Sequence, residues 1–218
     1  MQCPSQIFSC FLSTNIFKLG YPHQGAFPMK KSSIGLMVFL CIVISFPQAP
    51  AAQWVQTGGP EGGDIRAFAV SGTNFFAGTW DAGVFLSTNN GANWTKINSG
   101  LTNTKVMSLM ANGGKVFAGT YGGGAFLSTN NGISWIAANS GLMDTIVRSF
   151  AVSGTNVFAG TNRGVYLSTN NGISWTASNS GITDSVVSSF LVNGTNLFAG
   201  TGSSGVFLST DNGTSWTA

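Results

Sequence analysis

The sequence is poor in charge and in reactive side chains. Only 7% of its 218 residues are charged, and its three cysteines (Cys3, Cys10 and Cys41) and its single histidine (His23) all lie before residue 52. The remainder therefore holds no cysteine for a disulfide framework, and no histidine or cysteine for a nucleophile of the serine–histidine or cysteine–histidine kind. It also has no proline after Pro60 to interrupt a strand, and no stretch with helical periodicity.

The charge balance changes at about residue 52. Lys18, Lys30 and Lys31 precede this point, whereas all six acidic residues follow it together with the other six basic ones. The formal net charge of +3 therefore belongs to the N-terminal 51 residues. The basic isoelectric point gives no ground for nucleic-acid binding. No motif in the sequence indicates a cofactor or a metal site.

The N-terminal region has the order of a secretory signal at residues 29–51. Met29–Lys31 is basic, Ile34–Phe46 is almost wholly apolar, and Ala49–Ala51 has small residues at its first and third positions. A span across a bilayer needs about 20 apolar residues, so a membrane anchor or a buried helix is the less favoured alternative. We expect a protein that is secreted, periplasmic or on the cell surface, with no membrane span after cleavage. Residues 1–28 fit no part of such a signal and indicate a start codon assigned too early or an extended leader.

A repeated line, Ser-Thr-Asn-Asn-Gly-x-x-Trp, dominates the rest of the chain. Its four copies are 87–94, 128–135, 168–175 and 209–216, the last with Asp as its third residue, and their tryptophans are 41, 40 and 41 residues apart. A constant period of this length indicates a repeat architecture, and four-stranded propeller blades have periods of about 40–45 residues.

Each repeat contains the same four short segments, separated by turns rich in Gly and Asn. In the first repeat they are 65–70, 75–79, 84–87 and a segment that begins near Trp94. Runs rich in β-branched and aromatic residues between such turns predict strands joined by hairpins. One meander cannot bury both of its faces, so neighbouring meanders must cover it. We predict an all-β fold, a β-propeller of four-stranded antiparallel blades with about 41 residues per blade, with a linear β-solenoid as the alternative.

We expect one domain at 53–218, with repeats at about 65–105, 106–146, 147–186 and 187–218. Trp54-Val55-Gln56 matches the residues that follow each repeated line, although the last repeat begins its own copy at Trp216–Ala218. This surplus indicates a fragment of a longer array: a partial propeller whose open sheet faces could self-associate. A compact four-bladed ring is the alternative.

The repeated line resembles the Asp-box, or BNR repeat, whose pattern is Ser-x-Asp-x-Gly-x-Thr-Trp. The resemblance extends from Asp64 to Ala218. The family includes sialidases, sortilin-type receptor domains and photosystem II assembly factors, all built on β-propellers. The resemblance implies that the box lies on the hairpin between the third and fourth strands, away from any active site.

The residue types of the box fit a structural role. The third residue can accept hydrogen bonds from backbone N–H groups two residues on, the glycine supplies a positive φ, and the tryptophan offers apolar area and an N–H donor. Asn in place of Asp in three copies argues against calcium there. The residues expected to build the boxes are Ser87, Asn89, Gly91, Trp94, Ser128, Asn130, Gly132, Trp135, Ser168, Asn170, Gly172, Trp175, Ser209, Asp211, Gly213 and Trp216.

The repeats differ mainly on the face opposite the boxes. Strand parity places the loops between second and third strands there, together with the links between blades. Loops on a rigid scaffold commonly carry function, although these loops could also be ordinary variable segments with solvated charges. The candidate ligand-binding residues on this face are Trp80, Asp81, Tyr121, Asp144, Arg163 and Asp184.

Two functional classes remain open. We favour a secreted, non-catalytic scaffold or binding module for an unknown protein or glycan. The alternative is a sialidase-like glycoside hydrolase, or a fragment of one. The resemblance implies that such a site needs an arginine cluster and a Tyr–Glu pair, but Glu61 is the only glutamate of the chain, and Tyr166 stands where the other repeats have Phe. A hydrolase also needs two placed carboxylates, and nothing in the sequence pairs Asp81, Asp144 and Asp184.

Overall fold

The computed structural model describes residues 56–60 and 63–218. The chain divides into two units, 1–51 and 52–218, and the described residues all belong to the second. The expectations for residues 1–28 and for a secretory signal at 29–51 fall outside the described residues, as do Trp54 and Val55. Within the described part of the chain, no helix has the length and apolar character needed to cross a membrane.

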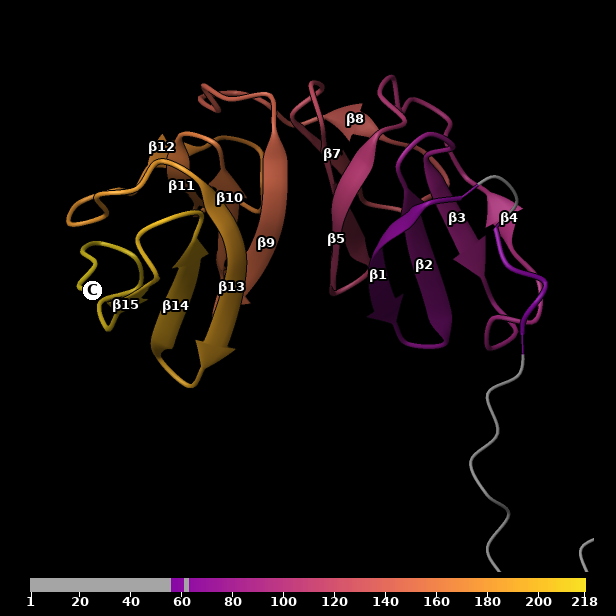
Figure 1. The fold of residues 1–218 in the computed structure, drawn as a ribbon. Coiled ribbons are helices and arrows are strands. Elements are labelled where there is room, and N and C mark those ends of the chain that lie inside the picture. Colours follow the sequence, from indigo (N-terminus) through magenta and orange to yellow (C-terminus); the bar gives the residue numbers. More distant parts are fainter. Residues whose placement is uncertain (1–55, 61–62) are drawn as a thin grey trace, which may run out of the picture. The chain divides into compact units, whose positions relative to one another are not determined.

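The described residues form four antiparallel sheets that follow one another along the chain (Figure 1). We number these sheets as blades 1 to 4. Their strands are β1 (Ile65–Ser71), β2 (Asn74–Thr79), β3 (Val84–Ser87) and β4 (Thr95–Lys96); β5 (Val106–Asn112), β6 (Lys115–Thr120), β7 (Ala125–Ser128) and β8 (Ile136–Ala137); β9 (Val147–Ser153), β10 (Asn156–Thr161), β11 (Gly164–Ser168) and β12 (Thr176–Ala177); and β13 (Val187–Asn193), β14 (Asn196–Thr201) and β15 (Val206–Ser209). The predicted all-β architecture of meandering blades is confirmed.

The last blade departs from the predicted four strands. Its sheet has three strands, β13–β14–β15, and the expected fourth is reduced to an isolated bridge between Leu208 and Thr217. In the other blades the fourth strand has only two residues, such as Thr95–Lys96, so this outermost strand is short throughout the array.

Every first strand carries a β-bulge near its start. In β1 the pairing passes from Ile65 opposite Thr79 to Ala67 opposite Gly78, so that Arg66 has no partner in the ladder. The same irregularity occurs in β5, β9 and β13, where the bulged residues are Met107, Arg148 and Ser188. A bulge re-aims its side chain relative to strict alternation, and bulges are frequent beside functional sites.

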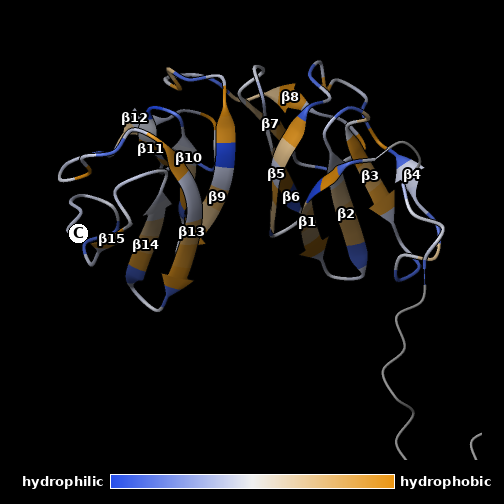
Figure 2. Ribbon diagram, viewed as in Figure 1, coloured by the Kyte–Doolittle hydropathy of each residue, from blue (hydrophilic) through white to orange (hydrophobic). Residues whose placement is uncertain are grey.

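Successive blades pack face to face through apolar cores. We call the face of a blade that meets the next blade along the chain its forward face, and the opposite one its backward face. Between blades 1 and 2, Phe76 and Val84 on the forward face are fully buried with Val106 on the backward face. The next two blade pairs repeat this core, and β1, β5, β9 and β13 contact one another in that order. Figure 2 shows apolar residues concentrated in the strands, for example in β2, β3 and β5.

The glycine in the second strand lets adjacent blades approach closely. A Cβ at Gly119 would lie 2.7 Å from the carbonyl oxygen of Val147 in the next blade and 2.2 Å from the hydroxyl of Ser108. A Cβ at Gly160 would lie 2.8 Å from the carbonyl oxygen of Val187, and one at Gly78 would lie 2.6 Å from the side chain of Val106. The predicted role of the Ala-Gly pair in close sheet packing is therefore seen at all three blade contacts.

Tryptophan side chains tie each blade to the one before it. The indole N–H of Trp135 donates to the carbonyl of Ile97, that of Trp175 to Ala138 and that of Trp216 to Ser178, at 2.6, 2.8 and 2.8 Å. The backbone N–H groups of the same three tryptophans donate to Ser99, Ser140 and Ser180 of the preceding blade. In Trp94 of blade 1 the indole nitrogen is buried without a partner among the described residues.

Candidate ligand-binding face

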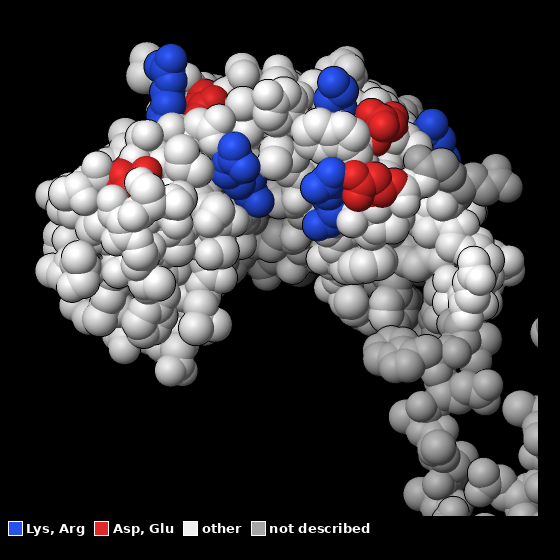
Figure 3. All heavy atoms as spheres, viewed as in Figure 1, with Lys and Arg blue, Asp and Glu red and all other residues white. Residues whose placement is uncertain are grey.

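The two ends of the strands make two different surfaces. One carries the turns between first and second strands and the four repeated boxes; we call it the box face. The other carries the loops 80–83, 121–124, 162–163 and 202–205 and the blade links 103–105, 143–145 and 183–185; we call it the variable face. Figure 3 shows charged residues gathered along the upper margin of the molecule, where the first strands begin. The charged residues that the sequence places in these loops, links and strand starts are Asp64, Arg66, Asp81, Lys105, Asp144, Arg148, Arg163 and Asp184.

The boxes form one repeated turn that is satisfied within itself. In the first copy the hydroxyl of Ser87 donates to the side-chain oxygen of Asn89 and accepts the N–H of Gly91, both at 2.9 Å. The same Asn89 oxygen accepts the N–H of Asn93, four residues on rather than two as expected. The other three copies repeat all three hydrogen bonds. Each box is therefore a turn held closed by hydrogen bonds among its own residues.

Two consecutive residues of each box adopt a left-handed backbone. Gly91 has a φ of 84°, as expected, but Asn90 before it has a φ of 56°, and the other three copies agree within a few degrees. Asn is among the few non-glycine residues that tolerate this region. The Asn-Gly pair is thus required by backbone geometry, a point that the sequence reasoning assigned to the glycine alone.

A second repeated device holds the loops of the variable face. The hydroxyl of Thr79 donates to the carbonyl of Gly83 at 3.0 Å and accepts the N–H of Ala82 at 2.9 Å. The amide of Asn98 accepts the N–H of Val84 and donates to the carbonyl of Ala82. Equivalent bonds involve Thr120, Thr161 and Thr201, and Asn139 and Asn179. The sequence analysis did not predict these hydrogen bonds, although the Thr and the Asn that make them recur at the repeat period.

The structure brings two predicted site residues together at the seam between blades 1 and 2. Trp80 directly follows β2 and Tyr121 directly follows β6, and their ring centroids lie 5.4 Å apart with the planes inclined at 54°. Tyr121 is 43% exposed and Trp80 is half-buried. Backbone bonds from Trp80 to Asp64 and from Tyr121 to Lys105, both 2.9 Å, fix the two residues to their own blades.

Two cations that the sequence reasoning did not name flank the same ring. The guanidinium carbon of Arg66 lies 5.2 Å from the centroid of Trp80, and the ammonium of Lys105 lies 5.8 Å from it. Both distances fall within the range of cation–π attraction. Arg66 is the bulged residue of β1 and also pairs with Asp64. We call Trp80, Tyr121, Arg66 and Lys105 the aromatic cluster.

The predicted acidic residues of the links mainly accept hydrogen bonds from backbone N–H groups of nearby residues. One carboxylate oxygen of Asp184 accepts the N–H of Val186, and the other accepts the N–H and hydroxyl of Ser203 and the N–H of Ser204, at 2.7 to 3.1 Å. These bonds, led by the one from Val186, lower the pKa of Asp184 to about 2. Asp144 accepts the N–H of Ile146 in the same way, while its other oxygen is buried without a partner among the described residues.

The remaining candidates do not join the cluster through any direct contact that the structure describes. Asp81 and Arg163 are exposed, and the backbone N–H of Arg163 donates to Thr161. Beside Arg163, Asn162 accepts a bond from the side chain of Arg148. Arg66, Arg148 and the first strands of all four blades line one central groove of about 280 Å³. Of the six predicted residues, only Trp80 and Tyr121 are therefore brought into direct contact.

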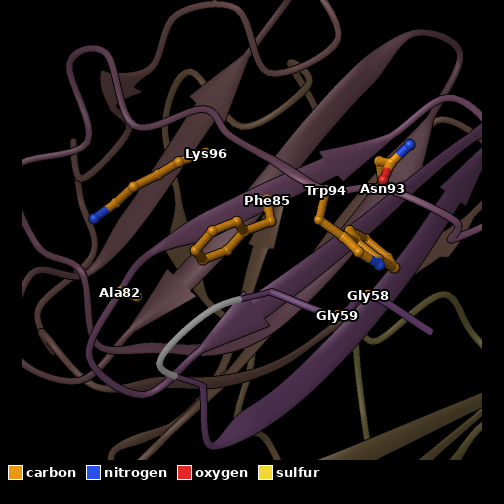
Figure 4. A pocket seen from close by; sticks show the side chains of 7 residues that line it. All are labelled: Gly58, Gly59, Ala82, Phe85, Asn93, Trp94 and Lys96. Atoms are coloured by element: carbon orange, nitrogen blue, oxygen red, sulfur yellow. The ribbon is translucent and has the colours of Figure 1, made fainter. Parts of the chain in front are cut away.

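A larger hollow, of about 420 Å³, lies on the backward face of blade 1 (Figure 4). It is bordered by Trp94, Phe85 and Lys96, with Gly58 and Gly59 on its other side. These are positions that the next blades bury against a preceding blade, as for Trp135 and Phe126. The hollow is thus part of a blade-packing surface rather than of the variable face.

Solved structures similar to this chain are β-propeller proteins. An ancestral GH74 enzyme aligns with a TM-score of 0.59 and 24% identity over 72% of this chain, and this chain spans only 24% of that one. The extracellular domain of a hybrid two-component system from B. thetaiotaomicron aligns with a TM-score of 0.59 and 17% identity, over 72% of this chain and 22% of that one. YCF48 bound to D1 peptide aligns with a TM-score of 0.51 and 14% identity, over 71% of this chain and 52% of that one.

These likenesses establish the β-propeller fold and nothing finer, because all of the identities are low. The chain spans about a quarter of the length of the first of these structures. No protein-family model matches the sequence, and a comparison with curated proteins finds no match.

Proposed function

We propose that this chain is a secreted, non-catalytic β-propeller module of the Asp-box type, and that its variable face binds a glycan or a protein segment at the aromatic cluster. The observation that carries the proposal is the packing of Trp80 and Tyr121 at 5.4 Å across the seam of two blades. Two rigid blades hold this pair, so little conformational entropy is lost when a ligand binds it.

The cluster combines two packed aromatic rings with two cations that lie over the ring of Trp80. An exposed aromatic ring offers an apolar face to a sugar ring or to an apolar peptide side chain, and its polar tip can hydrogen-bond. Arg66 and Lys105 add guanidinium and ammonium donors beside Trp80. Such donors favour a ligand that carries carboxylates, such as a uronic-acid glycan or an acidic peptide.

The state of the acidic residues supports a binding role over hydrolysis. A glycoside hydrolase needs two carboxyl groups facing one substrate bond. Asp184 already accepts four hydrogen bonds from its own chain, and Asp144 caps its own link. A fluorogenic sialic-acid or glucan substrate tests the alternative: turnover that is lost in Asp81→Asn would replace this proposal with a sialidase-like hydrolase.

Two further features support export and the Asp-box assignment. Residues 29–51 have the order of a secretory signal, and extracellular domains are among the similar structures. The boxes build the same closed turn in four copies, with three asparagines in place of the aspartate of the pattern. Recovery of the protein outside the cytoplasm, with a new N-terminus near residue 52, tests the export part.

Binding is best tested by titration calorimetry with matched probes. The probes are a uronic-acid oligosaccharide, a neutral oligosaccharide of the same length, and acidic peptides that contain an aromatic residue. We expect Trp80→Ala and Tyr121→Ala each to weaken binding about tenfold or more. Ile173→Ala serves as the control, because Ile173 is 68% exposed and lies in a box turn on the opposite face. Equal affinities for wild type and Trp80→Ala would refute a site at the cluster.

A further inference from the structure

The two faces at the ends of the blade array leave apolar side chains uncovered. On the forward face of blade 4, Leu191 and Val206 are 63% and 58% exposed. Their counterparts in blade 3, Ala151 and Val165, are 8% and 0% exposed because blade 4 covers them. A shallow hollow of about 220 Å³ lies at this face, and Leu191, Phe198, Gly200 and Val206 are among its lining residues.

The backward face of blade 1 is partly open: residues 56–60 of the same chain lie beside Trp94, but side chains of β1 are left exposed. Phe68 and Val70 are 66% and 55% exposed, whereas their counterparts in the later blades are partly buried. The indole N–H of Trp94 is buried without a partner among the described residues, unlike those of the other three box tryptophans. The backward face of blade 1 therefore carries the same kinds of residue that the later blades use to pack on the blade before them.

The blade contacts within the chain show which side chains pack between a forward face and the backward face of the next blade. Phe117 on a forward face packs 5.7 Å from Phe150 of the next blade, and Phe158 packs 6.4 Å from Phe190. Both Phe150 and Phe190 also pack on the tryptophan of their own box, as Phe68 does on Trp94 at 6.4 Å. Phe198 is the next forward phenylalanine in the series, and it has no following blade within the described chain.

The glycines of the two faces repeat the same correspondence. Gly172 and Gly213 of the boxes lie against Phe117 and Phe158 of the preceding blade, whereas Gly91 of blade 1 meets only its own Trp94 and the methyl group of Thr57. Gly78, Gly119 and Gly160 each receive a valine from the next blade, whereas Gly200 meets only its own Ser189. Ile65 is the residue of blade 1 that corresponds to those valines.

We propose that the forward face of blade 4 binds the backward face of blade 1 in a second copy of this chain. Phe198 then packs on Phe68 of the second copy, and Ile65 of that copy enters the space over Gly200. The contact is head to tail, so every open assembly keeps one free face of each kind until a ring closes. A second copy is favoured over an unrelated protein because the two faces reproduce both halves of a contact that the chain already makes three times.

The test uses charge placed on each face separately in protein expressed from the full sequence. Val206→Lys disables the blade 4 face and Phe68→Lys disables the blade 1 face, and both positions are exposed enough to leave the fold intact. Ile173→Lys is the matched control, because Ile173 is 68% exposed but lies in a box turn. Far-UV circular dichroism and a thermal melt verify that all variants fold.

Sedimentation velocity over a concentration series then distinguishes the outcomes. Wild type and Ile173→Lys should associate as concentration rises, while Val206→Lys alone and Phe68→Lys alone should remain monomers. An equimolar mixture of these two variants should form a dimer, because each retains the face that the other lacks. A monomeric wild type, a single face variant that associates like wild type, or a monomeric mixture would each overturn the proposal.

Discussion

Replacing Trp175 by Phe removes one donor from a blade contact while keeping an aromatic ring in place. The indole N–H of Trp175 donates to the carbonyl of Ala138 at 2.8 Å, and the two residues are 3% and 5% exposed. The substitution leaves a buried carbonyl unpaired, which costs about 1–3 kcal/mol. Lost packing of the five-membered ring adds about 1 kcal/mol. We therefore expect the free energy of unfolding to fall by about 2–4 kcal/mol.

Trp94→Phe is the matched comparison within the same chain. Trp94 occupies the same place in its box, but its indole N–H is buried without a partner among the described residues. Removing an unsatisfied buried donor relieves a desolvation cost, which offsets the lost packing. We expect this variant to lose less than about 1 kcal/mol.

Urea unfolding followed by far-UV circular dichroism measures both changes. The Val206→Lys background keeps association from contributing to the stability of either variant. The slope against urea must match wild type, because a smaller slope would mean that blades unfold separately. Equal losses for the two variants would refute the assignment of the tryptophan bond as the tie between blades.

Two further perturbations test the packing and the turns. Gly119→Ala should lower the free energy of unfolding by about 1–3 kcal/mol, because its Cβ would lie within 3 Å of atoms of both Ser108 and Val147. Gly200→Ala in the same Val206→Lys background is its control, since Gly200 there meets no following blade, and equal urea midpoints for the two would contradict the close-packing argument. Hydrogen bonds, first from Val186 and first from Ser215 respectively, lower the pKa of Asp184 and of Asp211 to about 2. Because both pKa values lie below those of the unfolded chain, the two carboxylates stabilise the fold fully above about pH 4 and lose that effect as pH falls toward about 2. Melting temperatures of wild type and of the Asp184→Asn, Asp211→Asn double variant should therefore converge over this interval, and a constant difference would show that the carboxylates do not titrate as described.

The strands, and the division of their loops between the box face and the variable face, could be predicted because both follow from the order of strands and turns within one repeat. The positions of β1 to β3 match the expected segments within one residue, since the Gly/Asn turns fix where each hairpin reverses. Parity then placed Trp80 and Tyr121 on one face, and their neighbouring places in successive repeats brought them together. The sequence predicts a turn at each box, but the side-chain oxygen of its third residue accepts the N–H four residues on rather than two.

The features that the sequence did not predict arise either from a β-bulge, which breaks the strict alternation of a strand, or from contacts between residues far apart in the sequence. Arg66 reaches Trp80 from a bulge, and strict alternation along β1 contains no signal for that extra residue. Trp175 finds its acceptor 37 residues earlier in the chain, a pairing that only the stacking of blades creates. Asp184 is a ligand candidate by its place in a link of the variable face, but its carboxylate accepts hydrogen bonds from Ser203, in a loop 19 residues away.

The repeated blade contact also bears on how such a gene can change in length. Each contact joins a forward face to a backward face of nearly constant composition, so duplication or loss of one whole repeat recreates a junction of the same kind. A partial insertion would instead break the register between a tryptophan and the carbonyl it meets in the preceding blade. Viable length variants of this protein are therefore expected in steps of one repeat of 40 or 41 residues.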